Sequence, residues 1–169
     1  MKTKLIETGL FIVFLGVSSV LACTCPENFD LSLRQRTENA ILGATAVFAG
    51  KVVGFEFKKD PKTEQSESDN KSQDEWSRRY AKFEVTQWWK LPLTNSILLR
   101  TDQFKSSNGM ETLDSCDFTF KAGESYVVLA YQGELGLFTN ACARTVRAND
   151  AYLTLDILGK GNAPQKSKE

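Results

Sequence analysis

The chain has 169 residues, with 21 basic and 21 acidic side chains and no histidine. This neutral balance, without a basic stripe, argues against nucleic acid as the main partner. The absence of histidine excludes Ser-His-Asp and Cys-His nucleophiles and histidine-ligated metal sites. Because no carboxylate pair or phosphate-binding loop can be placed either, we expect neither enzymatic activity nor a cofactor.

Residues 1–22 have the three parts of a secretory signal peptide: two early lysines, an apolar run over residues 10–17, and small apolar residues up to Ala22. The apolar run is shorter than the roughly 20 residues that a membrane-spanning helix needs. We therefore expect cleavage after Ala22, secretion to the extracellular space without a membrane span, and a mature chain that begins at Cys23.

The first half of the mature chain predicts a helix, a long strand and a polar loop. Apolar residues among polar ones indicate a helix over residues 31–42. Residues 46–57 are rich in Val and Phe and predict a strand, with Gly50 and Gly54 as bends or bulges. Residues 58–79 are almost wholly polar before Trp76, which is typical of an exposed, solvated loop.

The second half predicts several further strands and a closing helix. Alternating or clustered apolar residues mark the strands, over residues 80–89, 96–101, 117–120, 125–131 and 136–139. Residues 105–115 are expected to form a polar, turn-rich link. A helix over residues 149–158, capped by Asn149 or Asp150, precedes a polar, disordered tail over residues 161–169.

About five strands with a helix at each end predict a mainly β fold. We expect a five-stranded, OB-fold-like Greek-key barrel that forms one domain over residues 23–160. Of the paired aromatics Trp88 and Trp89, one ring is expected in the core and the other over the barrel surface. Asp114 and Asp117 are expected to be turn carboxylates at strand ends.

The four cysteines are Cys23, Cys25, Cys116 and Cys142, and an even number in an exported chain predicts two disulfides. A bridge between Cys23 and Cys25 is sterically poor, because one residue separates them, and two cross-pairings remain. Lipid attachment at Cys23 would leave an odd cysteine unpaired. Zinc bound by four thiolates would require closer cysteine spacing than this chain offers.

The new N-terminus offers a different chemistry. After cleavage, Cys23 would carry a free α-amino group, whose pKa is ordinarily near 7.7–8.0. Once deprotonated, this nitrogen and the Cys23 carbonyl oxygen can chelate a metal in a five-membered ring. The catalytic zinc of a partner enzyme keeps one open position, normally filled by water, that such a chelate could occupy.

Motifs spread over most of the mature chain resemble the netrin-like domain, and within it the inhibitory domain of the tissue inhibitors of metalloproteinases. The most specific is the mature start Cys23-Thr24-Cys25-Pro26. The others are the segments 47–52, 80–90, 115–118 and 123–128 and the sequence Cys142-Ala143-Arg144-Thr145. The resemblance implies a five-stranded barrel and the disulfides Cys23–Cys116 and Cys25–Cys142.

The resemblance also implies a site. Cys23 would bind the zinc of a partner metalloprotease through its main-chain nitrogen and oxygen, and Thr24 would enter the adjacent specificity pocket. The remaining inhibitory residues would be Cys25 and Pro26, which follow in the cleft, and Leu113, Asp114 and Ser115, which are joined to Cys23 through Cys116.

This chain departs from the family in lacking a third disulfide and the separate C-terminal subdomain. We therefore expect a minimal single-domain, monomeric inhibitor of zinc metalloendopeptidases. The alternative is a netrin-like module of the extracellular space or cell envelope that binds another protein without inhibiting a protease, with or without a lipid anchor at Cys23.

Overall fold

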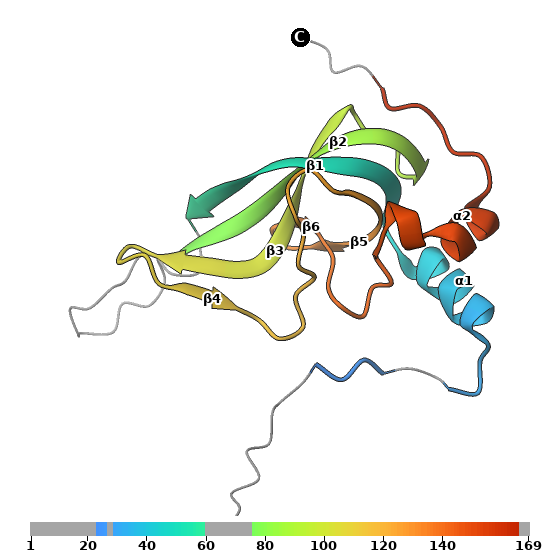
Figure 1. The fold of residues 1–169 in the computed structure, drawn as a ribbon, viewed down its shortest axis with the longest axis horizontal. Helices are drawn as coiled ribbons and strands as arrows, with labels where there is room; N and C mark the ends of the chain where they lie inside the picture. The colour runs from blue at the N-terminus through green and yellow to red at the C-terminus, as the bar shows by residue number, and fades with distance from the viewer. Residues whose placement is uncertain (1–22, 27–28, 60–75, 166–169) are drawn as a thin grey trace, which may run out of the picture.

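Five strands close into a barrel in the computed structural model, which describes residues 23–26, 29–59 and 76–165 (Figure 1). Around the ring they are β1 (Ala46–Lys59), β2 (Trp76–Lys90), β3 (Ser96–Ser106), β6 (Gly136–Phe138) and β5 (Ser125–Gly133), and β5 returns to β1. All neighbours are antiparallel except β3 and β6, which are parallel and meet at Arg100 and Phe138. The predicted mainly β barrel is confirmed.

Two glycines let β1 curve through the barrel. The register between β1 and β2 shifts between Ala49 and Gly50 and again between Val52 and Gly54, so the predicted bulges are confirmed. A Cβ at Gly50 would lie 2.8 Å from the backbone oxygen of Glu84, a distance that side chains do not tolerate. The close approach of β1 to β2 therefore requires glycine at this position.

The barrel interior is filled by a cluster of aromatic rings. The ring of Phe83 meets those of Phe48 and Phe120 edge to face, at centroid distances of 5.4 and 5.1 Å. Tyr126 joins them 5.0 Å from Phe120. Edge-to-face pairs at these distances add about 0.5–1.5 kcal/mol each to the burial of the rings.

A second apolar cluster lies on the outside of β1 and β5, under the helices. It consists of Ala44, Val47, Val127, Leu129 and Ala151. Because successive residues of a strand face opposite sides, Val127 faces this cluster while Val128 faces the barrel interior. Burial on both faces explains why the β5 sequence is continuously apolar instead of alternating.

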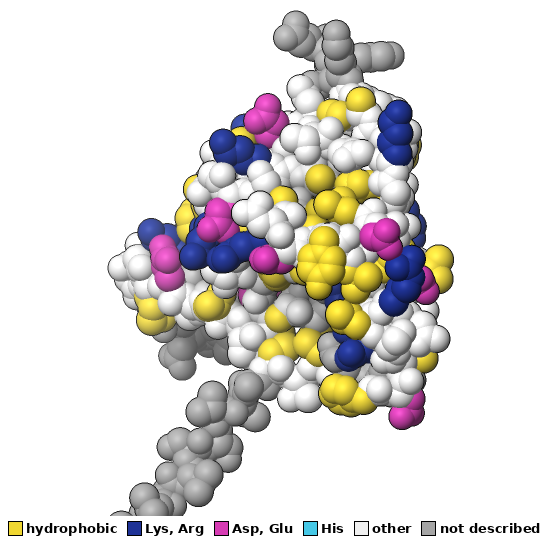
Figure 2. Space-filling view, turned by 45° about the vertical axis from the view of Figure 1, so that its right-hand side comes forward, with side chains coloured by type: hydrophobic (Ala, Val, Ile, Leu, Met, Phe, Trp, Pro, Cys, Tyr) yellow, Lys and Arg dark blue, Asp and Glu magenta, His cyan; other side chains and the backbone are white. Residues whose placement is uncertain are grey.

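Two helices cover this side of the barrel. α1 (Leu33–Gly43) begins at a capping box, in which Ser32 and Gln35 satisfy each other's backbone N–H groups. α2 (Tyr152–Leu158) follows the 3₁₀ turn η2 (Ala148–Asp150). Ala151 is its N-cap and makes no side-chain cap, so the predicted caps Asn149 and Asp150 are wrong. Hydrophobic side chains are visible among the charged ones on this face (Figure 2).

Some predicted boundaries differ from the structure. The predicted strand over residues 117–120 is wrong: only Asp117 makes a bridge, with Asn140, and Phe118 and Phe120 fill the barrel from an irregular segment. The predicted link 105–115 contains the end of β3 and a short strand, β4 (Glu111–Leu113), which pairs with β3. Another short strand, β7 (Val146–Arg147), pairs with β5.

Strands also extend into both ends of the predicted polar loop 58–79, since β1 continues to Lys59 and β2 begins at Trp76. The middle of that loop, residues 60–75, lies outside the described residues. So do the predicted signal peptide, residues 1–22, and the end of the tail, residues 166–169.

The predicted disordered tail is wrong for residues 161–165. Trp88 and Asn162 exchange two backbone hydrogen bonds, of 2.9 and 2.8 Å, and the Gln165 N–H donates to the Leu93 carbonyl at 2.8 Å. The Trp88 indole N–H donates to the Ala163 carbonyl. The tail up to Gln165 therefore belongs to the folded domain.

The paired tryptophans of β2 lie on different sides of the sheet. The Trp88 ring packs against the cluster inside the barrel, and the Trp89 ring packs against the outer cluster.

Candidate functional site

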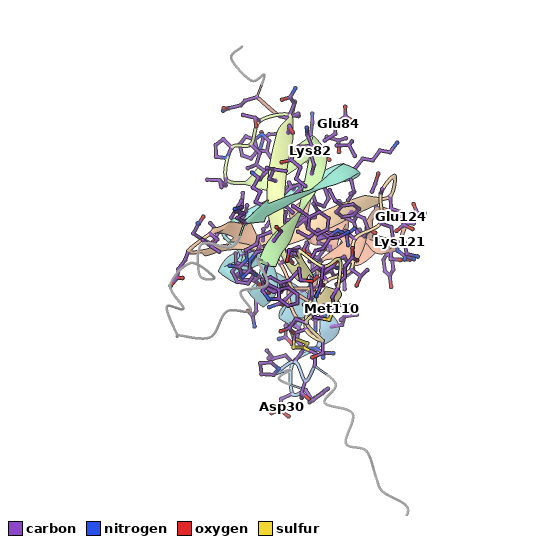
Figure 3. The ribbon with its side chains drawn as sticks, turned by 90° about the vertical axis from the view of Figure 1, so that its left-hand side faces the viewer. Asp30, Lys82, Glu84, Met110, Lys121 and Glu124 are labelled. Atoms are coloured by element: carbon purple, nitrogen blue, oxygen red, sulfur yellow. A yellow bond between two sulfur atoms is a disulfide. The ribbon has the colours of Figure 1, made fainter. Side chains whose placement is uncertain are left out.

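The segment Cys23–Pro26 is fixed to the lower end of the barrel by two disulfides. Cys23 is joined to Cys116 and Cys25 to Cys142, with Cα–Cα distances of 4.9 and 5.3 Å. The implied pairing is confirmed. Figure 1 shows the blue N-terminal segment below the barrel, with the loops after β4 and β6 reaching toward it. The disulfide sulfurs lie above the labelled Asp30 in Figure 3.

The two loops that receive the disulfides use the same local turn. The Cys116 N–H donates to the Asp114 carboxylate at 2.8 Å, and the Cys142 N–H donates to the Asn140 side-chain oxygen at 3.0 Å. In each case an Asp or Asn two residues earlier in the chain closes an Asx-turn. Each turn fixes the backbone at its cysteine and therefore the direction in which the cysteine side chain points.

The two turns are also joined to each other. The Ala141 N–H donates to the Cys116 carbonyl at 2.8 Å, and Asp117 and Asn140 form an antiparallel bridge. The N-terminal segment is therefore attached at two points, Cys23 and Cys25, to a pair of connected turns, and only Thr24 separates the two points. Little freedom is left to the main chain of Cys23, Thr24 and Cys25.

Asp117 connects these two turns to the barrel wall. Its two carboxylate oxygens accept from the Asp102 N–H at 3.1 Å and from the Gln103 side-chain amide at 3.0 Å. Burial raises the pKa of the Asp117 carboxyl, and these hydrogen bonds oppose the rise. The geometry supports the prediction that Asp114 and Asp117 are structural turn carboxylates.

All eight residues of the predicted inhibitory site belong to this one end of the molecule. Thr24, Pro26, Leu113, Asp114 and Ser115 are exposed, whereas Cys23, Cys25 and Cys116 are half-buried. Leu113 ends β4 and is 58% exposed, although large apolar side chains are normally buried. The disulfide Cys23–Cys116 joins the two stretches of chain.

A cavity of about 250 Å³ adjoins the Cys25–Cys142 disulfide. It lies between the N-terminal segment and α1, and its polar lining comes from Arg36, Asn39 and Arg144. Arg144 has φ = 58°, a left-handed conformation that is uncommon for a residue with a side chain. The sequence pattern did not indicate that these three residues line a cavity, because they meet only through the fold, although Arg144 belongs to the motif Cys142-Ala143-Arg144-Thr145.

The cysteines cannot supply thiolates to a metal. The Sγ atoms of Cys23, Cys25 and Cys142 lie within 4.8 Å of one another, but all four cysteines are in disulfides and the described residues contain no free cysteine. The alternative of a zinc ion bound by four thiolates is therefore wrong for this structure.

Comparisons with known proteins found no match to this chain, either among protein-family models or among curated proteins.

Within the described part of the chain, neither helix has the length and apolarity needed to cross a bilayer. Two disulfides are consistent with an oxidising, extracellular environment.

Proposed function

We propose that the chain is a secreted, netrin-like inhibitor of zinc metalloendopeptidases, related to the tissue inhibitors of metalloproteinases. Export would remove residues 1–22 and leave Cys23 as the N-terminal residue. The α-amino nitrogen and carbonyl oxygen of Cys23 would then bind the catalytic zinc of the protease. The observation that carries the proposal is the double attachment of Cys23-Thr24-Cys25 to two connected turns.

A rigid N-terminus is what such an inhibitor needs. A flexible segment that becomes ordered on binding loses conformational entropy, and a segment that is already ordered does not. The two disulfides and the two Asx-turns order Cys23 before any partner arrives. Most of the binding free energy is then available for the zinc bond and for the Thr24 side chain, which is exposed.

The chemistry requires an unprotonated amine. A free α-amino group has a pKa of about 7.7–8.0, so at neutral pH the proton must leave as the nitrogen binds zinc. The Cys23 carbonyl oxygen completes the chelate and would take the position of the zinc-bound water on which hydrolysis depends. The exposed residues Leu113, Asp114 and Ser115 would extend the contact along the same cleft.

The position of the amine provides the sharpest test. The exported protein would first be checked by N-terminal sequencing and intact mass, which should show Cys23 unmodified and four hydrogens lost to disulfides. Inhibition of a panel of zinc endopeptidases is then measured for this protein and for a version with one extra alanine before Cys23. The extra residue moves the amine by about 3.5 Å, and we expect inhibition to be abolished.

Equal inhibition by both versions would rule out the chelation mechanism. If the native form with a free Cys23 inhibits no member of the panel, the non-inhibitory interaction module is favoured instead. A lipid-modified Cys23 would block the amine and would also exclude chelation.

Thr24 gives a second test, on selectivity. Because Thr24 is exposed and both neighbouring cysteines are held by disulfides, Thr24→Gly should leave the fold intact and remove the side chain that enters the specificity pocket. We expect inhibition constants to change unequally across the panel, by about 10-fold or more for some proteases, since a buried side chain contributes about 1–3 kcal/mol. A uniform change across all proteases would contradict a specificity role.

A further inference from the structure

Sulfur atoms of the two disulfides lie in contact with each other. The Sγ atom of Cys23 is 3.9 Å from that of Cys142, its neighbour in the other disulfide. Cys23, Cys25 and Cys142 form a group in which all Sγ atoms lie within 4.8 Å of one another. Cys116 is not a member of this group, although it is bonded to Cys23.

Disulfides exchange when a thiolate attacks one sulfur of the bond and expels the other as a thiolate. A thiolate on Cys23 would already be in contact with a sulfur of the Cys25–Cys142 bond. The Sγ atom of Cys116 lies more than 4.8 Å from at least one sulfur of that bond, so a thiolate on Cys116 would start from a less favourable position. When the Cys23–Cys116 bond is opened, a thiolate released on Cys23 is therefore better placed to attack the second disulfide than a thiolate released on Cys116.

We propose that these cysteines form a thiol-responsive relay that moves the anchor of the N-terminal segment from one turn to the other. A small external thiol attacks Cys116, forms a mixed disulfide there and releases Cys23 as a thiolate. Cys23 then attacks Cys142, forms a Cys23–Cys142 bond and expels Cys25 as a thiolate. A second external thiol resolves the mixed disulfide on Cys116.

The sum of these steps balances. Two external thiols are oxidised to one disulfide, one protein disulfide is reduced, and the remaining protein disulfide has changed partners. The products are the Cys23–Cys142 bond and free thiols on Cys25 and Cys116. Cys23 would then be held by the turn at Asn140 and released from the turn at Asp114, which would change the presentation of Thr24. This chemistry does not depend on the proposed inhibitory function.

A matched pair of variants tests the asymmetry. Cys116→Ser and Cys23→Ser each remove the same disulfide and each leave one thiol. The folded variants are held at pH 8 without added reductant, quenched with acid and alkylated, and the labelled cysteine is identified by tandem mass spectrometry. In Cys116→Ser we expect the label to divide between Cys23 and Cys25, and in Cys23→Ser to remain on Cys116.

Label confined to Cys23 in the first variant would overturn the proposal, and so would equal exchange in both variants. Since loss of a disulfide can prevent folding, the native protein provides a second measurement. Brief treatment with reduced glutathione, followed by alkylation, should label Cys116 and Cys25. Label on Cys116 and Cys23 would instead show simple opening of one bond and would refute the relay.

Discussion

Asp117 is a buried carboxylate that lies one residue after an anchoring cysteine. It is 9% exposed, and its two oxygens accept hydrogen bonds from residues of β3. Such a group links the attachment of the N-terminal segment to the barrel wall. Its ionisation therefore affects the stability of the proposed site as well as that of the whole domain.

The raised pKa of Asp117 predicts the direction of a pH effect. Because burial raises the pKa above the unfolded value of about 3.9, the folded state binds the proton more tightly than the unfolded state. Protonation of Asp117 therefore stabilises the folded state, fully below about pH 3.9. This stabilisation is lost as the pH rises from about 3.9 through the folded pKa of Asp117. Over that pH range the free energy of unfolding of the native protein should fall relative to that of Asp117→Asn. Urea unfolding at pH steps from 3 to 7 measures the difference, and a difference independent of pH would contradict the prediction.

At the scale of elements, β1 offers a matched pair of glycines. Alanine at Gly50 would place its Cβ 2.8 Å from the Glu84 backbone oxygen, whereas at Gly54 no atom lies within 4 Å. We expect Gly50→Ala to lower the free energy of unfolding by about 1–3 kcal/mol, because the β1–β2 contact must open. Gly54→Ala should change it by less than about 0.5 kcal/mol. Chemical denaturation of both variants tests this, and equal effects would show that the bulges, not the close contact, determine the cost.

The sequence predicted elements well where local pattern and tertiary environment agree. The strand at 46–57 and the helix at 31–42 lie within one or two residues of β1 and α1, because both were predicted from local patterns of apolar residues. The segment 117–120 misled the prediction, since alternating Asp, Phe, Thr and Phe suggested a strand. There Phe120 is buried and Phe118 is partly buried by tertiary packing, and the backbone pairs only at Asp117.

The part of the candidate site that a local motif encodes was predictable from the sequence, and the part that arises only from folding was not. The motif Cys23-Thr24-Cys25 is local, so its residues and, through family resemblance, its disulfide partners were found. The cavity residues Arg36 and Arg144 come from segments more than 100 positions apart, and no pattern within either segment indicates that they line a common cavity. The contact between sulfurs of different disulfides likewise arises only when both loops are in place.

At the scale of the whole molecule, both ends of the described chain are tied down, one covalently and one by hydrogen bonds. The disulfides close loops with sequence separations of 93 and 117 residues. In the chain-entropy model the first bridge stabilises the fold by about 4–5 kcal/mol and the second by less, because the two loops overlap. The C-terminal segment instead lies along β2 and the turn at Leu93. Its hydrogen bonds satisfy backbone groups of Trp88 and Leu93 that would otherwise lie unpaired at the edge of β2 and in the turn after it.

A truncation tests whether residues 161–165 stabilise the barrel. Ending the chain after Lys160 removes four hydrogen bonds made to the protein by Asn162, Ala163 and Gln165. Each contributes about 0.5–1.5 kcal/mol net, and part of this is offset by the entropy that the segment regains. We expect a loss of about 1–3 kcal/mol and a shift of tryptophan emission to longer wavelength, because Trp88 becomes hydrated. A chain ending after Gln165 keeps all four bonds and serves as the control. If the shorter truncation product matched this control in both measurements, the domain would end at residue 160, as the sequence predicts.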